Sequence, residues 1–218
     1  MSEQMFKNLT LVAFVLLFVP AVIFLVRSKV LAAVQKKLAI LVLVTLLVEV
    51  ISRILWYKKI NNLPIYHFYT VIEFLLILNI YKEPLRKVFD VKYLVIIGVG
   101  FTGFAILNTI FFQDLFTFNS NVTTLMGLLV VVFALSYFYA LLKEVKYSAL
   151  ETNPMFWINS GFLIYFSSNL ILFYMNNSLF KEVSEASLIL WGLHAIVNIV
   201  LTIFYTIALW VRPKKLLH

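Results

Sequence analysis

The chain has 218 residues, of which 63% are hydrophobic and 13% charged, with a formal net charge of +8 and no cysteine. A soluble domain carries about 25% charged residues, and the mean hydropathy of +0.99 lies far from that class. The lack of cysteine excludes disulfides, thiolate catalysis and cysteine-ligated metal. The basic residues fall in short segments between apolar runs, which indicates membrane orientation and contact with anionic lipid, not nucleic-acid binding.

Seven apolar runs each approach the length of about 20 residues that a helix needs to cross a hydrocarbon core. Backbone groups cannot stay unpaired in lipid, so each run is predicted to be a helix. We therefore predict an all-α, polytopic integral membrane protein, with one seven-helix domain over residues 1–218 and no soluble domain. The predicted spans are residues 9–26, 38–57, 65–81, 93–112, 122–142, 155–175 and 188–210.

The first span, residues 9–26, is almost uniformly apolar, and Pro20 predicts a kink in it. Its apolar run exceeds that of a typical signal peptide, and the basic loop that follows would resist export. We expect this span to remain in the protein as scaffold.

The second span holds two ionisable residues, Glu49 and Arg53, on one helical face. Charged groups at the centre of a bilayer cost about 2.5–3.5 kcal/mol on insertion scales, so they are expected to turn inward and pair. The i,i+4 spacing leaves two alternatives open. The pair either neutralises itself or belongs to a functional site.

The third span places Tyr69 and Glu73 on one face, with His67 at its flank near the end of the helix. Glu73 has no cation on its own helix, so it is expected to be protonated or to pair across the bundle. For His67, a structural role or a contact with lipid headgroups is the alternative to a role in a functional site.

The fourth span contains Gly98, Gly100 and Gly103 in the spacing G-x-G-x-x-G. The dinucleotide fingerprint needs a preceding strand and a soluble crevice, so close helix packing is the better interpretation here. The fifth span, 122–142, is mostly apolar and is expected to face lipid.

The sixth span carries Tyr165 and Asn169, and the seventh carries His194 and Asn198 one turn apart. His194 and Asn198 could instead form a hydrogen-bonded clasp between helices, and Tyr165 and Asn169 could join helices in the same way. Together with Glu49, Arg53, Tyr69 and Glu73, these residues predict a polar cavity between the second, third, sixth and seventh spans.

Basic residues also predict orientation. Thirteen lie in the first, third and fifth loops and the C-terminal segment, four lie in the N-terminal segment and the other loops, and Arg53 lies inside a span. The positive-inside rule then places the N-terminus outside, the C-terminus in the cytoplasm and the cavity open to the outside. Bacterial inner membrane is the expected location.

Three segments carry a resemblance. NNLPIYHFYTVIEF, PMFWINSGFLIYFSSNLILFY and LWGLHAIVNIVLTIFYTIALW are similar to segments of small uncharacterised seven-helix membrane proteins of Bacteroidota. The resemblance implies the seven-helix layout and a signalling or accessory role. We therefore expect a small sensor or accessory protein that acts through a cytoplasmic or membrane protein partner, with homo-oligomers as a further possibility.

A second hypothesis is an intramembrane enzyme. Glu49-x-x-x-Arg53 and His194-x-x-x-Asn198 resemble parts of the CAAX-processing and bacteriocin-immunity protease family. By that resemblance Glu49 would be the general base, and His67 and His194 would bind water or stabilise the oxyanion. The chain departs from the family pattern, because Val48 replaces the first Glu and Leu63 occupies a Phe position.

A third hypothesis is an ion- or proton-linked transporter or a pore-forming membrane effector, with Glu49 and Glu73 in the path. No cofactor and no metal site is predicted, because the spacing of the histidines and glutamates compels neither. Whether the protein is an enzyme is left open, with the preference against it.

Overall fold

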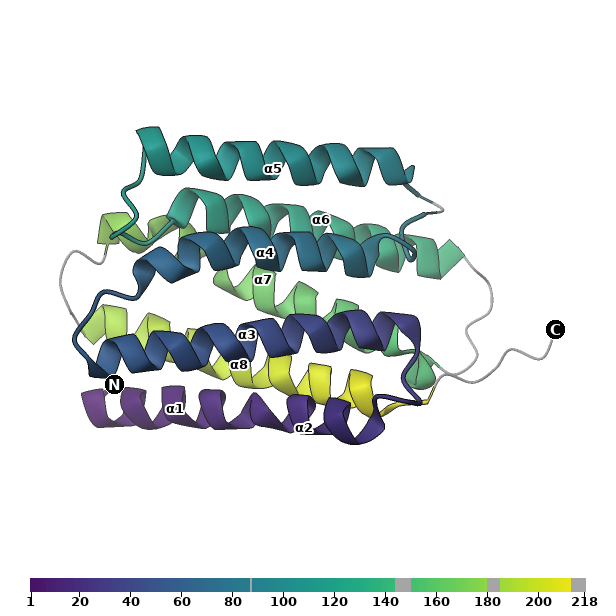
Figure 1. Cartoon of the computed structure of the whole chain (residues 1–218), viewed down its shortest axis with the longest axis horizontal. Helices are drawn as coiled ribbons and strands as arrows, with labels where there is room; N and C mark the ends of the chain where they lie inside the picture. The colour runs from purple at the N-terminus through teal and green to yellow at the C-terminus, as the bar shows by residue number, and fades with distance from the viewer. Residues whose placement is uncertain (87, 144–149, 180–184, 213–218) are drawn as a thin grey trace.

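Long helices joined by short loops make up most of the computed structural model, which describes residues 1–86, 88–143, 150–179 and 185–212 (Figure 1). The helices are α1 (Glu3–Leu16), α2 (Phe18–Arg27), α3 (Ala33–Tyr57), α4 (Leu63–Tyr81), α5 (Val91–Phe111), α6 (Ser120–Lys143), the short 3-10 helix η1 (Leu150–Thr152), α7 (Pro154–Leu179) and α8 (Glu185–Trp210).

Seven helical segments of the described chain are long and apolar enough to cross a membrane, with α1 and α2 together forming the first. Each predicted span overlaps one of them, so the all-α class and the multi-pass layout are confirmed. Five of the basic residues used to predict orientation lie outside the described residues, namely Lys87, Lys146, Lys181, Lys214 and Lys215.

Prolines mark helix ends as their chemistry requires. Pro64 lies in the first turn of α4 and Pro154 begins α7, where the missing N–H costs no intrahelical bond. The kink predicted at Pro20 is a break between α1 and α2 at Leu17. It lies one turn earlier because a proline ring clashes with the carbonyl four residues before it.

The helices pack so that the first and last spans are neighbours. α8 contacts α1, α2, α3 and α7, and α6 packs along α7. In Figure 1, α1 and α2 form one edge of the bundle and α5 forms the opposite edge, beside α4 and α6. The four helices that carry the predicted polar residues, α3, α4, α7 and α8, therefore lie between these edges.

Aromatic side chains fill the centre of the bundle. Phe74 of α4 contacts Phe101 of α5 and Phe133 of α6, with ring centroids 4.0 and 6.5 Å away. Tyr81 of α4 lies 5.7 Å from Phe133 and 6.0 Å from Phe162 of α7. The outer faces instead carry many exposed Leu, Ile, Val and Phe side chains, as a surface that faces lipid requires.

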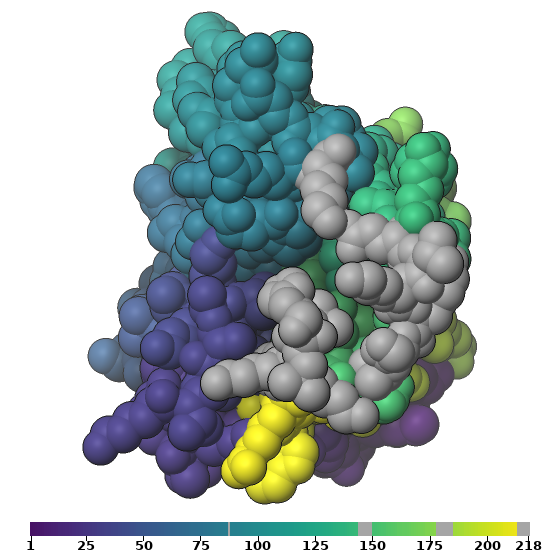
Figure 2. All heavy atoms as spheres, turned by 90° about the vertical axis from the view of Figure 1, so that its right-hand side faces the viewer, coloured from purple at the N-terminus to yellow at the C-terminus, as the bar shows by residue number. Residues whose placement is uncertain are grey.

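The end of α8 is capped by side chains at the end of α2 and the start of α3. Arg27 donates to the carbonyl oxygens of Leu209 and Trp210, and its guanidinium lies 4.8 Å from the Trp210 ring centroid. Gln35 is buried and donates to the carbonyls of Ala208 and Val211 over 2.8 and 2.9 Å. In Figure 2 the yellow end of α8 accordingly borders the purple N-terminal helices. These donors satisfy carbonyls that a helix end leaves without partners.

Candidate functional site

Glu49 lies at the interface of α3 and α4, in a polar set that reaches the end of the bundle. The Tyr66 hydroxyl donates to Glu49 Oε1 over 3.2 Å and lies 2.9 Å from Ser52 Oγ. The side-chain amide of Asn62 donates to the same serine oxygen over 2.6 Å. Asn62 is the N-cap residue of α4, so this set connects the carboxylate to the loop between α3 and α4.

Glu73 lies further along α4, among tyrosines of three helices. Its carboxylate interacts electrostatically with the hydroxyls of Tyr69, Tyr165 and Tyr205, which belong to α4, α7 and α8. It also interacts with Glu49 of α3. Among the described residues, no Lys, Arg or His nitrogen lies within 4.0 Å of the Glu73 carboxylate. The two glutamates thus interact electrostatically with one another, and Arg53 acts on Glu49 as a cation, whereas no described cation pairs with Glu73.

Tyr69 is held by α3. Its hydroxyl lies 2.8 Å from Thr45 Oγ1, and Thr45 itself donates to the Leu41 carbonyl over 2.9 Å. Since the threonine hydroxyl has one proton, Tyr69 is the donor in the contact between them.

Arg53 makes no ion pair with Glu49. Its Nη2 donates to the Thr10 carbonyl of α1 over 2.8 Å, and its guanidinium lies 4.3 Å from the Phe14 ring centroid. Arg53 Nε is buried and has no hydrogen-bond partner among the described residues. The neutralising pair that the i,i+4 spacing allows is therefore not formed, because a helix carbonyl and an aromatic ring of α1 hold the guanidinium.

His194 is held by two asparagines. Its Nδ1 lies 2.9 Å from Asn169 Oδ1, and its Nε2 lies 2.8 Å from Asn198 Nδ2. An amide oxygen accepts and an amide nitrogen donates, so the imidazole is neutral with its proton on Nδ1. Asn169 also donates to the Tyr165 carbonyl over 2.8 Å. This is the clasp between α7 and α8 that was weighed as the alternative to a ligand site, and neither glutamate takes part in it.

His67 points to a different part of the bundle. Its Nε2 lies 2.9 Å from the Thr117 carbonyl and its Nδ1 lies 3.3 Å from the Thr109 hydroxyl. The ring therefore ties α4 to α5 and to the loop before α6. Glu49, His67 and His194, the three residues of the protease hypothesis, have no hydrogen-bond partner in common.

A second polar network, at the α5–α6 connection, was missed by the sequence analysis. Asn108 donates to Gln113 over 3.0 Å, Gln113 donates to Ser120 over 2.7 Å, and Asn121 donates to Asn108 over 2.9 Å. Asn119 donates to Thr70 Oγ1 of α4 over 3.0 Å. The density of amide side chains in residues 108–121 was the available signal.

A buried clasp of the same kind lies closer to the other end of the bundle. The Tyr81 hydroxyl donates to Asn159 Oδ1 over 2.6 Å, and the Asn159 amide donates to the Ala134 carbonyl over 3.1 Å. Tyr81 and Asn159 are both 0% exposed. This network joins α4, α6 and α7, and Asn159 too was absent from the predicted site.

Two pockets of the described chain are lined by none of the predicted site residues. These have volumes of about 460 and 600 Å³ and lie at the loop before α5 and between α4 and α5. No three His, Asp or Glu side chains of the described residues are grouped as metal ligands. Between α3, α4, α7 and α8 the structure places carboxylates and tyrosine hydroxyls that interact electrostatically, groups that can exchange protons.

Comparison of the chain with models of known protein families, with curated proteins and with solved structures found no match.

Proposed function

We propose that the protein is a small proton-responsive membrane protein, a sensor or accessory component in which Glu49 and Glu73 take up and release protons inside the bundle. The observation that carries this proposal is the shared cluster of two carboxylates and four tyrosines, Tyr66, Tyr69, Tyr165 and Tyr205, without a described ion-pair partner for Glu73. Carboxylates inside a membrane are costly to insert and commonly mark proton or ion pathways.

Arg53 could convert a change in the protonation of Glu49 into a movement of α1. It interacts electrostatically with Glu49, yet its hydrogen bond goes to Thr10 of α1. Loss of a proton from Glu49 strengthens the attraction between the carboxylate and the guanidinium. We propose that this draws Arg53 toward Glu49 and loosens α1 from α3, a two-position switch of a single side chain.

Infrared difference spectroscopy between acidic and alkaline buffer tests the proton sites. We expect the carbonyl band of a protonated carboxylic acid, reduced in Glu73→Gln and in Glu49→Gln. The control is Glu151→Gln, which changes an exposed glutamate in η1 outside the seven spans. A difference band that is unchanged in both intramembrane variants would overturn the proposal.

The switch itself is tested by a distance. The chain has no cysteine, so Leu11→Cys on α1 and Ile54→Cys on α3 can carry spin labels at positions that are 52% and 48% exposed. We expect the distance between the labels to depend on pH in the otherwise unchanged protein and to be constant when Glu49 is Gln. A distance that is independent of pH throughout would exclude the switch.

A second candidate, proton-linked transport, is favoured by a succession of polar groups along the bundle. From the cluster, Tyr205 interacts electrostatically with Tyr81, and Tyr81 with Tyr137. The Asn153 amide donates to the Tyr137 hydroxyl over 3.2 Å, just before α7 begins. Proton flux into liposomes distinguishes the candidates. A sensor gives none, whereas a transporter gives flux that Glu73→Gln abolishes.

For orientation, we propose an outer N-terminus and a cytoplasmic C-terminus in a bacterial inner membrane, which the thirteen-to-four distribution of basic residues supports. In that orientation the Asn62 end of the polar set lies on the outer side, and the loop between α4 and α5 lies in the cytoplasm, available to a protein partner.

A further inference from the structure

A groove runs between α4 and α5 at the edge of the bundle. It has a volume of about 600 Å³ and is lined mainly by apolar side chains of both helices, among them Leu75, Leu78, Leu94 and Val95. Figure 1 shows why it is open, since α5 forms an edge and has no helix beyond it. The groove is separate from the carboxylate cluster and does not depend on the proposed function.

Small residues form part of the groove. At Gly98 a Cβ atom would lie 3.1 Å from Leu78 Cδ1, so α5 approaches α4 closely there. At Gly103, which also lines the groove, a Cβ atom would meet nothing within 4 Å. Gly98 therefore allows close helix packing, as the sequence predicts. Gly103 does not pack closely and instead leaves open space in the groove.

The groove is polar at one end and apolar along the rest. Asn79 and Lys82 lie at the end of α4, beside Val91 at the start of α5. From there to Gly103 the groove follows α5 for about 18 Å at 1.5 Å per residue. The hydrocarbon part of one leaflet is about 15 Å deep, so the apolar length suits one acyl chain.

The charge at the polar end has no acidic partner. Lys82 is exposed, and no described Asp or Glu pairs with it. Its neighbours differ, because Arg86 lies 4.0 Å from Glu83 and Lys92 lies 3.5 Å from Asp90. Lys82 is thus a cation without a described acidic partner at this end of the groove, and the Lys37 ammonium, which donates to the Asn79 carbonyl over 2.6 Å, adds a second positive charge beside it.

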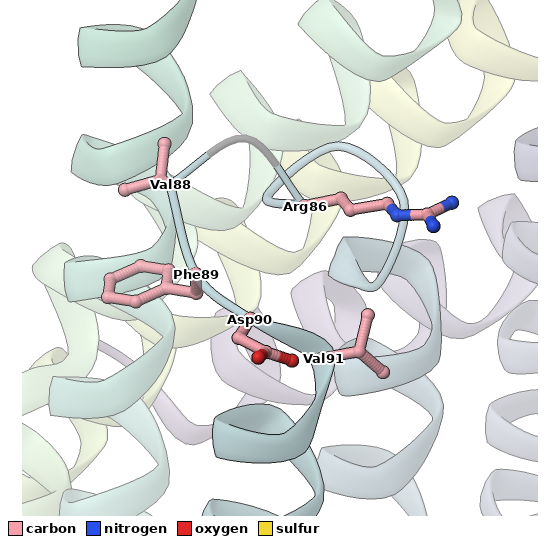
Figure 3. A pocket seen from close by; sticks show the side chains of 5 residues that line it. All are labelled: Arg86, Val88, Phe89, Asp90 and Val91. Carbon is pink, nitrogen blue, oxygen red and sulfur yellow. The ribbon is translucent and has the colours of Figure 1, made fainter.

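A second pocket adjoins the groove. It has a volume of about 460 Å³ and is lined by Arg86, Val88, Phe89, Asp90 and Val91 (Figure 3). Val91 lines both pockets, so space for a polar group lies next to the mouth of the apolar groove. The second pocket offers space for a headgroup, Lys82 offers a positive charge for a phosphate, and the apolar groove offers room for an acyl chain. The three follow one another in the order of these parts in a phospholipid.

We propose that this groove is a binding site for one anionic phospholipid, whose phosphate lies at Lys82 and whose acyl chain lies between α4 and α5. Bulk lipid covers the other apolar faces of the bundle without selection. At this site the groove holds one acyl chain, and Lys82 favours a lipid with a negatively charged headgroup.

Native mass spectrometry of the full chain in detergent, titrated with phosphatidylglycerol or phosphatidylcholine, tests the site. We expect one tightly bound phosphatidylglycerol and weaker phosphatidylcholine binding, with phosphatidylglycerol affinity reduced about fivefold in Lys82→Gln. The matched control is Lys143→Gln at the end of α6, whose ammonium contacts Tyr139. Equal affinity for the two lipids would overturn the proposal.

The groove is tested by filling it. Gly103→Leu places a side chain in the groove, and Gly100→Leu serves as its control, because both positions have open space but only Gly103 lines the groove. We expect loss of the bound lipid in Gly103→Leu alone. Equal binding by the two variants would place the lipid elsewhere and overturn the site.

A photoreactive amino acid at Val99, which lines the groove and is 70% exposed, identifies the occupant in native membranes. An adduct with the mass of an anionic phospholipid supports the proposal. An adduct with a second copy of the chain or with another protein would overturn it.

Discussion

Arg53 donates a hydrogen bond to the carbonyl oxygen of Thr10, 43 residues earlier in the chain, and makes no ion pair with Glu49 one turn away. The contact joins α3 to α1 and leaves the carboxylate to the hydroxyl of Tyr66. The Arg53 guanidinium, which could have formed an ion pair with Glu49, instead helps to attach the first span to α3.

This contact predicts the stability of variants of Arg53. Arg53→Gln removes a charged hydrogen bond and the contact with the Phe14 ring, so we expect a loss of about 1–3 kcal/mol. Unfolding in detergent micelles measures it, with Lys29→Gln in an exposed position as the control. Equal stability of the two variants would mean that Arg53 does not hold α1.

The clasp of His194 predicts a structural effect that is separate from any proton response. In a double-mutant cycle of Asn169→Ala and His194→Phe, we expect a coupling free energy of about 0.6–1.7 kcal/mol, as for other hydrogen bonds between membrane helices. The infrared band of the carboxylic acids should persist in Asn169→Ala. Its loss in a folded variant would place His194 within the proton site.

Two glycines predict opposite results for the same substitution. At Gly161 of α7 an added Cβ would lie 2.9 Å from Phe204 Cβ of α8, an atom next to the backbone that cannot move freely. We expect Gly161→Ala to cost about 1–3 kcal/mol through overpacking. At Gly103 the space is open, so Gly103→Ala should be neutral or gain up to about 1 kcal/mol. Thermal unfolding compares them, and equal losses would contradict the packing of α7 on α8.

Orientation can be tested because the chain has no cysteine. Ile60→Cys, between α3 and α4, and Val88→Cys, between α4 and α5, lie at opposite ends of α4 and are 53% and 39% exposed. In intact cells we expect an impermeant thiol reagent to label position 60 alone, and in opened cells both positions. Labelling of position 88 alone in intact cells would reverse the proposed orientation.

The spans were predictable because they depend on length and hydropathy, which are properties of a continuous stretch of chain. Helical phase was predictable only as a grouping of residues on one helix. Thr70 and Glu73 share a face by phase, yet Thr70 bonds to Asn119 while Glu73 is close to Tyr165 and Tyr205. Which neighbour each side chain meets depends on the rotation and packing order of the helices, and the periodicity of one helix does not contain that information.

For the candidate site too, single residues could be predicted from the sequence but their partners on other helices could not. Glu49 and Glu73 stand out in an apolar sequence, and they interact electrostatically in the structure. His67 and His194 also stand out, but asparagine and threonine partners with ordinary sequence surroundings satisfy them locally. Uncharged partners of this kind cannot be identified from the charge pattern or the hydropathy of the sequence.

The cap on α8 determines the order in which the fold can be completed. Arg27 and Gln35 supply the donors for carbonyls at 208–211, more than 170 residues later in the chain. A ribosome makes the N-terminal hairpin first, so those donors have no protein acceptors until the last helix is synthesised. Packing of the first span against α8 is then a late, long-range step, and a chain that stalls before α8 leaves α1 and α2 without their contacts to that helix.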